Sequence, residues 1–98
     1  MRPWCLTLLL AVCMGAQAQQ VSLVFAGDTT LDDAPGALIE RGGDPLAGFA
    51  SLFAQADLRV ANLECVVATT GDPGEKNYTF RAHPRVLPVL KRHLDGVT

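Results

Sequence analysis

The stretch LVFAGDTTLDD, residues 23–33, runs from four apolar residues directly into Gly27 and Asp28. A near-continuous apolar run that includes β-branched and aromatic side chains is typical of a strand buried on both faces of a parallel sheet. We therefore predict a buried strand over residues 21–26, after which Gly27 lets the backbone turn sharply. Asp28 then lies at the carboxyl end of this strand, where open α/β sheets bind their ligands.

Helices and strands are predicted to alternate along the rest of the chain. Asp44 and Pro45 favour a helix start, since Asp is a good N-cap and Pro suits the first helical position. Apolar residues then recur at helical spacing as far as Ala56, and Pro84 opens a second helix. The predicted elements are a strand at 21–26, a loop at 27–43 with a helical turn at 37–41, a helix at 44–56, a strand at 58–63, a loop at 66–78, a helix from 84 and a strand at 96–98.

This order of elements indicates the fold class. Strands that alternate with helices predict a parallel sheet with right-handed crossovers. Three strands, the last of which begins only at residue 96, do not close such a layer. We therefore expect an α/β fold, of which this chain of 98 residues holds the N-terminal part.

The first 18 residues have the features of an export signal. Arg2 is positively charged, residues 4–14 are apolar, and Ala16-Gln17-Ala18 matches a small-x-small cleavage site. The apolar run is shorter than the about 20 residues that span a bilayer. We predict a secretory signal peptide over residues 1–18, a domain over residues 19–98, and a periplasmic or extracellular location in the cell envelope. The alternative is an uncleaved N-terminal anchor.

Charge and cysteine content exclude several classes of function. The chain has a net charge of −2, and loss of Arg2 with the signal makes it one unit more negative. This charge argues against binding to nucleic acid or to an anionic membrane surface. Any membrane contact is expected only through the signal peptide or through partners in a synthesis complex. Cys65 is the only cysteine after residue 18, which leaves neither an internal disulfide nor zinc-type Cys spacing.

Two predicted strand ends carry side chains suited to a hard metal ion. Asn62 and Glu64 are two residues apart on an extended segment, so both point to one side, and Asp28 ends the neighbouring strand. Two carboxylates and an amide oxygen suit Mg²⁺, Mn²⁺ or Ca²⁺ and contribute to a two-metal phosphoesterase site. The alternative is that each Asp or Asn is an ordinary turn or cap residue.

Three sequence elements carry a resemblance to a known family. Gly27-Asp28, ADLRVANLE at 56–64 and KNYTFRAHP at 76–84 resemble the N-terminal part of the capsule synthesis protein CapA family, over residues 21–98. Those bacterial proteins are linked to poly-γ-glutamate capsule production and have a calcineurin-like metallophosphoesterase fold. The resemblance implies the N-terminal part of an α/β/β/α sandwich, in which Asp28, Asn62 and Glu64 occupy the family's metal-site positions.

The chain departs from that family pattern at two places. The wider metallophosphoesterase superfamily usually has His two residues after its first Asp, where this chain has Thr30. The family also has an Asn-Asn-His element after its third strand, whereas this chain stops at Thr98. We therefore expect no complete dinuclear site and no catalysis by this chain alone, and the catalytic residues remain unassigned.

Three basic side chains have competing interpretations. Arg81 is a candidate substrate-binding residue that clamps a phosphate or carboxylate, and equally a candidate for a surface salt bridge. His83 precedes Pro84 and is expected to cap the following helix rather than to bind metal. His93 is expected to be solvated near a helix end.

Two functional hypotheses follow. The first is an exported metal-dependent hydrolase of the phosphoesterase type, which acts in capsule, poly-γ-glutamate or other cell-envelope polymer synthesis when the domain is complete. The second is a non-catalytic envelope protein on the same fold that binds or retains an anionic polymer. In both, the expected partner is an anionic polymer or a phosphate-containing small molecule. A nucleotide-binding domain is disfavoured because no Gly-x-Gly-x-x-Gly follows the first strand.

Overall fold

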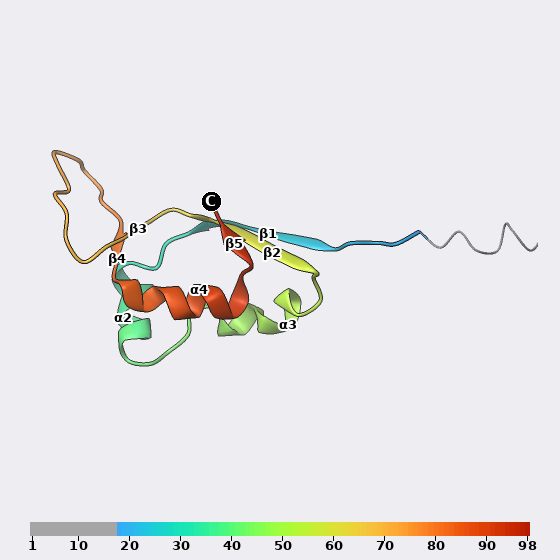
Figure 1. The fold of residues 1–98 in the computed structure, drawn as a ribbon. Coiled ribbons are helices and arrows are strands. Elements are labelled where there is room, and N and C mark those ends of the chain that lie inside the picture. The colour runs from blue at the N-terminus through green and yellow to red at the C-terminus, as the bar shows by residue number, and fades with distance from the viewer. Residues whose placement is uncertain (1–17) are drawn as a thin grey trace, which may run out of the picture.

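The computed structural model describes residues 18–98 (Figure 1). The predicted signal peptide therefore lies outside the described residues, apart from Ala18. The elements in chain order are β1 (Leu23–Thr29), α2 (Asp33–Glu40), the 3₁₀ helix η1 (Ala47–Phe49), α3 (Ala50–Phe53), β2 (Leu58–Leu63), β3 (Val66–Val67), β4 (Arg81–Ala82), the 3₁₀ helix η2 (Pro84–Val86), α4 (Leu87–His93) and β5 (Gly96–Val97). No helix in the described part is long and apolar enough to cross a membrane.

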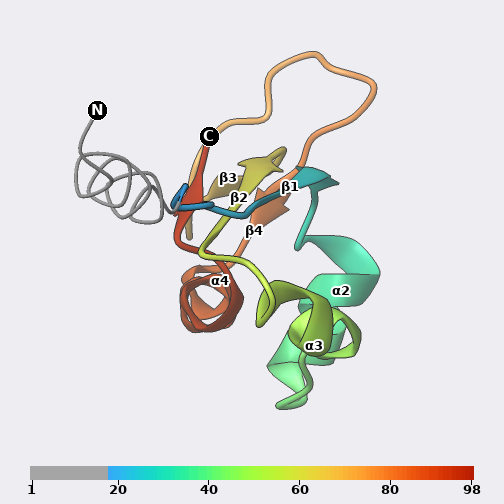
Figure 2. The same cartoon turned by 90° about the vertical axis from the view of Figure 1, so that its right-hand side faces the viewer.

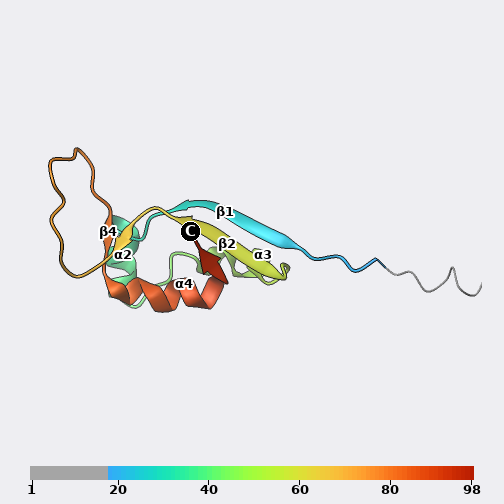
Figure 3. The same cartoon turned by 45° about the horizontal axis from the view of Figure 1, so that its top comes forward.

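A parallel sheet with strand order β1-β2-β5 forms one layer of the molecule. The α/β class and the parallel sheet predicted from the alternating elements are thus confirmed. Figures 1 and 3 show α2, α3 and α4 on the same side of this sheet, and Figure 2 shows the sheet and the helices from the side. One face of the sheet is therefore covered by helices and the other is open.

The open face corrects the predicted environment of the first strand. β1 was expected to be buried on both faces, but Leu23 is 52% and Phe25 73% exposed, while Val24 and Ala26 are half-buried. An apolar run in the sequence predicts a strand correctly, but burial of both its faces needs a layer on each side. β1 also continues to Thr29, so Gly27 and Asp28 lie within the strand and not in a sharp turn after it.

Helical segments differ from the prediction in two regions. Residues 27–43 contain a full helix, α2, where only a turn at 37–41 was expected. Pro35 lies in its first turn, where a missing N–H costs nothing, and Gly42 ends it in the left-handed region at φ +85°. The helix predicted over 44–56 is reduced to η1 and α3. Phe53 is its only buried apolar residue, so little packing holds a longer helix in place.

The main apolar core lies beneath one end of the sheet, between α2, α4 and a small second sheet. Parallel pairing of β3 with β4 forms this second sheet and closes the long loop 68–80, which projects from the molecule in Figure 1. The buried members of the core cluster are Leu31, Ile39, Cys65, Ala82, Val86, Val89 and Leu90. The predicted helix start at Pro84 is confirmed, because His83 caps η2 by accepting a hydrogen bond from the Arg85 N–H at 3.1 Å.

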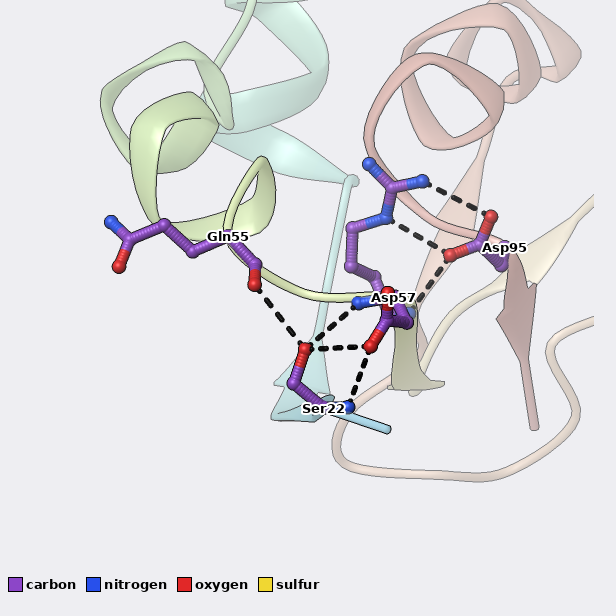
Figure 4. A network of polar contacts seen from close by, with 5 residues as sticks. Ser22, Gln55, Asp57 and Asp95 are labelled. Carbon is purple, nitrogen blue, oxygen red and sulfur yellow. Dashed lines mark hydrogen bonds and ion pairs between the residues drawn. The ribbon is translucent and has the colours of Figure 1, made fainter. Parts of the chain in front are cut away.

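Polar side chains join the three strands at their amino ends (Figure 4). The Ser22 N–H donates to Asp57 Oδ2 at 2.7 Å, and this backbone hydrogen bond lowers the pKa of Asp57. Arg59 Nε and its backbone N–H donate to Asp95 Oδ2 at 2.9 and 2.8 Å. The hydrogen bond to Asp95 raises the pKa of Arg59, and the same contact lowers the pKa of Asp95. These contacts link β1 to β2 and β2 to β5.

Candidate metal centre at the carboxyl ends of β1 and β2

The register of the sheet aligns three polar side chains in a row. Asp28 of β1 pairs with Asn62 of the central strand β2. On the other side, the Thr98 N–H donates to Ala61 O, and Thr98 O accepts from the Leu63 N–H, both at 3.0 Å. Thr98 thus flanks Asn62 as the next residue after β5. The carboxyl end of the sheet therefore carries three neighbouring polar residues, in the order Asp28, Asn62 and Thr98.

A β-bulge at Gly27 brings Asp28 into this row. Ala26 pairs with Ala61, and the next pair joins Asp28 to Asn62, so Gly27 is left without a partner in β2. Because side chains alternate between the two faces of a strand, a regular register would pair Asp28 with Leu63 and turn it to the other face. A Cβ atom at Gly27 would meet no atom within 4 Å, so the bulge does not depend on glycine for space.

The predicted metal ligands meet at one nitrogen atom. Asn62 Nδ2 donates to Asp28 Oδ1 at 2.8 Å and to Glu64 Oε2 at 3.0 Å. Glu64 follows β2 directly, and its N–H donates to Thr29 O at 3.1 Å, which fixes its backbone against β1. The structure therefore brings together the Asp28, Asn62 and Glu64 side chains that the sequence singled out.

Thr98 is a fourth member of the group, and the sequence alone did not identify it. Its hydroxyl Oγ1 donates to Asn62 Oδ1 at 3.0 Å. A threonine after a two-residue strand has no distinctive signal in a sequence. Its place in the group depends on the register between β2 and β5, which only the three-dimensional structure gives.

The electrostatics of the group favour a cation. Both carboxylates are exposed, and neither forms an ion pair with a described basic residue. Their oxygens nevertheless converge on one uncharged amide, so like charges lie close together without a compensating positive charge. Residues 18–98 contain no group of three His, Cys, Asp or Glu side chains placed to hold a metal ion, so the third protein ligand here is the Asn62 amide.

The side-chain oxygen atoms of this group are chemically suited to bind a hard divalent ion. Two carboxylates and one amide oxygen are the ligand types that Mg²⁺, Mn²⁺ and Ca²⁺ prefer. The observed amide orientation does not yet complete this set, because its nitrogen and not its oxygen faces the carboxylates. A cation at this position therefore requires Asn62 to turn its amide.

Thr30 lies just beyond β1, beside an apolar cavity of about 460 Å³. The cavity extends from Asp28 and Thr29 to the aromatic side chains of Phe49 and Phe53. Thr30 is half-buried and has a short hydroxyl side chain where the superfamily resemblance implies an imidazole. The candidate metal-binding cluster of Asp28, Asn62, Glu64 and Thr98 is called the metal group below. It adjoins this apolar cavity through Asp28, on the side of β1 that has no neighbouring strand.

Arg81 lies in a different environment from the metal group. Its backbone N–H donates to Asp32 Oδ2 at 2.9 Å, and its guanidinium Nη1 donates to Gly71 O at 3.2 Å. It lines a cavity of about 250 Å³ together with Glu40 and His83. No hydrogen bond or ion pair among the described residues joins Arg81 to the metal group. Its role in substrate binding stays a prediction.

His93 corrects the expectation of a solvated side chain. It is buried, at 7% exposure, and its Nε2 lies 2.7 Å from Asp44 Oδ2. The same oxygen accepts from Arg92 Nη1 at 2.6 Å, and Asp44 Oδ1 accepts from the Leu46 N–H at 2.9 Å. Burial alone raises the pKa of Asp44, but the hydrogen bonds from His93, Arg92 and Leu46 together lower it. This cluster ties the turn that precedes η1 to the end of α4.

A comparison with protein families accounts for most of the chain. Residues 22–98 match the family described as bacterial capsule synthesis protein PGA_cap, and this range includes Asp28, Asn62, Glu64 and Thr98. No curated protein and no solved structure matches the chain. Because the match spans most of the sequence, the chain belongs to the bacterial capsule synthesis protein family PGA_cap.

Proposed function

We propose that this protein is an exported component of capsule, poly-γ-glutamate or other envelope polymer synthesis, and that its complete domain is a metal-dependent hydrolase of the phosphoesterase type. Membership of the capsule synthesis family supports the biological role. The observation that carries the chemistry is the convergence of the Asp28 and Glu64 carboxylates on Asn62 Nδ2. Export rests on the signal peptide predicted over residues 1–18.

We further propose that residues 19–98 form the N-terminal part of a metallophosphoesterase-like α/β/β/α sandwich. The open face of the β1-β2-β5 sheet supports this arrangement. Leu23 and Phe25 are largely exposed there, although apolar side chains on a strand normally pack against another layer. The pairing of Phe25 with Val60 and of Asp28 with Asn62 places the metal group on the same open face. In the proposed sandwich, another sheet, distinct from the β3–β4 sheet, packs on this face. It covers the apolar residues and leaves the metal group at its rim.

The proposed cofactor is one divalent cation, Mn²⁺, Mg²⁺ or Ca²⁺, held by Asp28, Asn62 and Glu64. When bound, such an ion supplies Lewis-acid polarisation of a phosphoryl oxygen. The two carboxylates neutralise and position the ion, and the β1–β2 backbone pairing keeps them at a fixed separation. Thr30 offers a hydroxyl where an imidazole ligand stands in the superfamily, so this half of the site is suited to one ion and not to two.

The proposed substrate is an anionic polymer or a phosphate-containing small molecule, and not a nucleic acid. Arg81 is the proposed anion contact, because its guanidinium lines a cavity at the molecular surface and is anchored by one hydrogen bond to Gly71 O. A planar guanidinium matches the two oxygens of a phosphate or carboxylate.

A second candidate function is retention of an anionic polymer without catalysis. The observation that favours it is the hydrogen-bonded state of the site, in which Asn62 Nδ2 already lies between the two carboxylates. This reading predicts polymer binding that persists in EDTA. Loss of polymer binding on chelation contradicts it.

Isothermal titration with Mn²⁺, Mg²⁺ and Ca²⁺ tests the metal proposal. We expect the protein to bind one ion, and the double variant Asp28→Asn, Glu64→Gln to lose at least about tenfold in affinity, since each substitution removes a charged ligand. Asp33→Asn is the matched control, because Asp33 is an exposed carboxylate outside the group. Absence of binding by the unmodified protein, or equal binding by the double variant, contradicts the proposal.

A further inference from the structure

Asn62 lies at the centre of the candidate site with both ends of its amide engaged. The nitrogen donates to the two carboxylates, and the oxygen accepts from the Thr98 hydroxyl. Asn62 is also half-buried in the central strand, between Asp28 on one side and Thr98 on the other. The amide therefore connects the carboxylates to Thr98.

A cation between the carboxylates requires the Asn62 amide to turn its oxygen, and not its nitrogen, toward them. An N–H group repels a cation, whereas the carbonyl oxygen of Asn is a good ligand for a hard ion. The two ends of the amide have nearly the same shape, so a half-turn of the terminal amide group exchanges oxygen for nitrogen without moving the backbone. After this turn, Asn62 Oδ1 faces the carboxylate side and Nδ2 faces Thr98.

The hydroxyl of Thr98 is suited to both orientations. A hydroxyl carries one donor and two acceptor lone pairs and rotates to match its partner. It donates to Asn62 Oδ1 in the observed state and can accept from Nδ2 after the turn. A side chain with only donors or only acceptors would match one orientation and oppose the other.

The backbone around Thr98 keeps the hydroxyl in place while the amide turns. The Thr98 N–H and C=O form 3.0 Å hydrogen bonds with Ala61 and Leu63, the two neighbours of Asn62 in β2. Asp95 further fixes the start of β5, through its carboxylate and its own N–H, which contact Arg59. The rearrangement is thus confined to the Asn62 side chain and one hydroxyl rotor.

We propose that Thr98 is a positioning residue of the metal site, whose hydroxyl holds the Asn62 amide in either orientation and so permits a metal-dependent turn of that amide. This inference rests on the proposed function, because it presupposes a cation between Asp28 and Glu64. The hydroxyl contributes more in the metal-bound state. Coordination through Oδ1 polarises the amide, which makes Nδ2–H a stronger donor to Thr98.

Two variants of Thr98 test the inference through metal affinity. Thr98→Val replaces the hydroxyl with a methyl group of the same shape, and Thr98→Ser keeps the hydroxyl as a matched control. We expect Thr98→Val to bind Mg²⁺ or Mn²⁺ about three- to tenfold more weakly, because the hydrogen bond lost in the metal-bound state is stronger than the one lost in the metal-free state by about one ordinary hydrogen bond. We expect Thr98→Ser to bind within about twofold of the unmodified protein. Hydrogen exchange of the β5 amides checks that both variants keep their register.

The side-chain NH₂ resonances of Asn62 provide a second readout that does not depend on activity. We expect them to shift when diamagnetic Mg²⁺ is added to the unmodified protein, because the group moves from carboxylate partners to Thr98. Metal binding with unchanged Asn62 resonances, equal affinity of Thr98→Val, or equal weakening by Thr98→Ser overturns the inference and leaves the proposed function intact. Absence of any metal binding by the unmodified protein overturns the proposed function and the inference together.

Discussion

The carboxylate of Asp44 contacts three groups from two separate segments of the chain. Leu46 N–H donates to one oxygen, while Arg92 and the buried His93 contact the other. A single side chain therefore holds the turn before η1 and fixes the end of α4. Because these hydrogen bonds favour the ionised form more strongly than burial opposes it, the pKa of Asp44 is lower in the folded state than in the unfolded chain.

The lowered pKa of Asp44 gives the first prediction. A carboxyl group whose pKa falls on folding stabilises the protein at pH values above its ordinary pKa, which is 3.8 for Asp44. This contribution is lost as the pH falls through the pKa of the folded state. Asp44→Asn removes the charge and keeps an oxygen for Leu46. We expect it to lower the free energy of unfolding by about 1 kcal/mol at pH 7. The difference should shrink as the pH falls through the lowered, folded-state pKa of Asp44, where the carboxyl group becomes protonated in both states.

Urea unfolding of both proteins between pH 2 and pH 7 measures this effect. Asp57 and Asp95 also have lowered pKa values, so the Asp44→Asn variant should keep part of its acid sensitivity. A constant difference between the two proteins across the whole pH range contradicts the assignment of the lowered pKa to Asp44.

Some residues of the candidate site could be predicted from the sequence, and others could not. Asn62 and Glu64, two residues apart at one strand end, and Asp28 at the other form only a weak local pattern, and the family resemblance is what singled these three residues out as metal-site positions. Thr98 and the bulge at Gly27 were not identifiable, because both are properties of pairing between strands. The burial of His93 was missed for a similar reason, since its partner Asp44 is 49 residues away in the sequence.

At the scale of elements, short strands depend on side-chain contacts for their position. β5 has only two residues, and its pairing with β2 covers two positions. The contact between Arg59 and Asp95 lies directly before β5 and joins the side chains and backbones of both residues. This contact therefore helps to set the register that places Thr98 beside Asn62.

A prediction on Asp95 tests this link. Asp95→Ala removes both hydrogen bonds to the Arg59 side chain and the one to its N–H, so β5 should open more often. We expect the Thr98 amide, which donates to Ala61 O, to exchange its hydrogen on the order of tenfold faster. Native-state hydrogen exchange measures this rate.

Asp72→Ala is the control for that experiment. Its carboxylate caps Gly74 N–H within the exposed loop 68–80 and does not contact the three-stranded sheet. Thr98 should therefore exchange at its normal rate in this variant. Equal exchange of Thr98 in Asp95→Ala and in the unmodified protein shows that backbone pairing alone holds β5.

The helical elements show where local signals were sufficient. Pro84 and the preceding His83 predicted a capped helix start correctly, because the proline ring and the cap act within a few residues. The same reasoning failed at Asp44 and Pro45. Asp44 caps only the turn before η1, and the apolar stripe that follows finds few partners, so the helix ends at Phe53. Local signals predict where a helix begins, whereas packing decides how far it extends.

On the scale of the whole molecule, apolar residues are divided between a closed core and an open sheet face. Val86 is completely buried between α2, α4 and the small second sheet, whereas Phe25 is 73% exposed on the open face. Apolar residues in the sequence predicted the strands and the parallel sheet. They did not predict burial, because burial depends on which layers cover the sheet, and no layer covers this face within residues 18–98.

Because of this division, two apolar substitutions should change the free energy of unfolding by very different amounts. Val86→Ala removes buried methyl groups and should lower the free energy of unfolding by about 2 kcal/mol. Phe25→Ser replaces an exposed ring and should change it by no more than about 0.5 kcal/mol. Urea unfolding at several protein concentrations measures both effects. A large, concentration-dependent loss for Phe25→Ser would mean that a second copy of the chain covers the open face, and that the exposed ring is part of an interface.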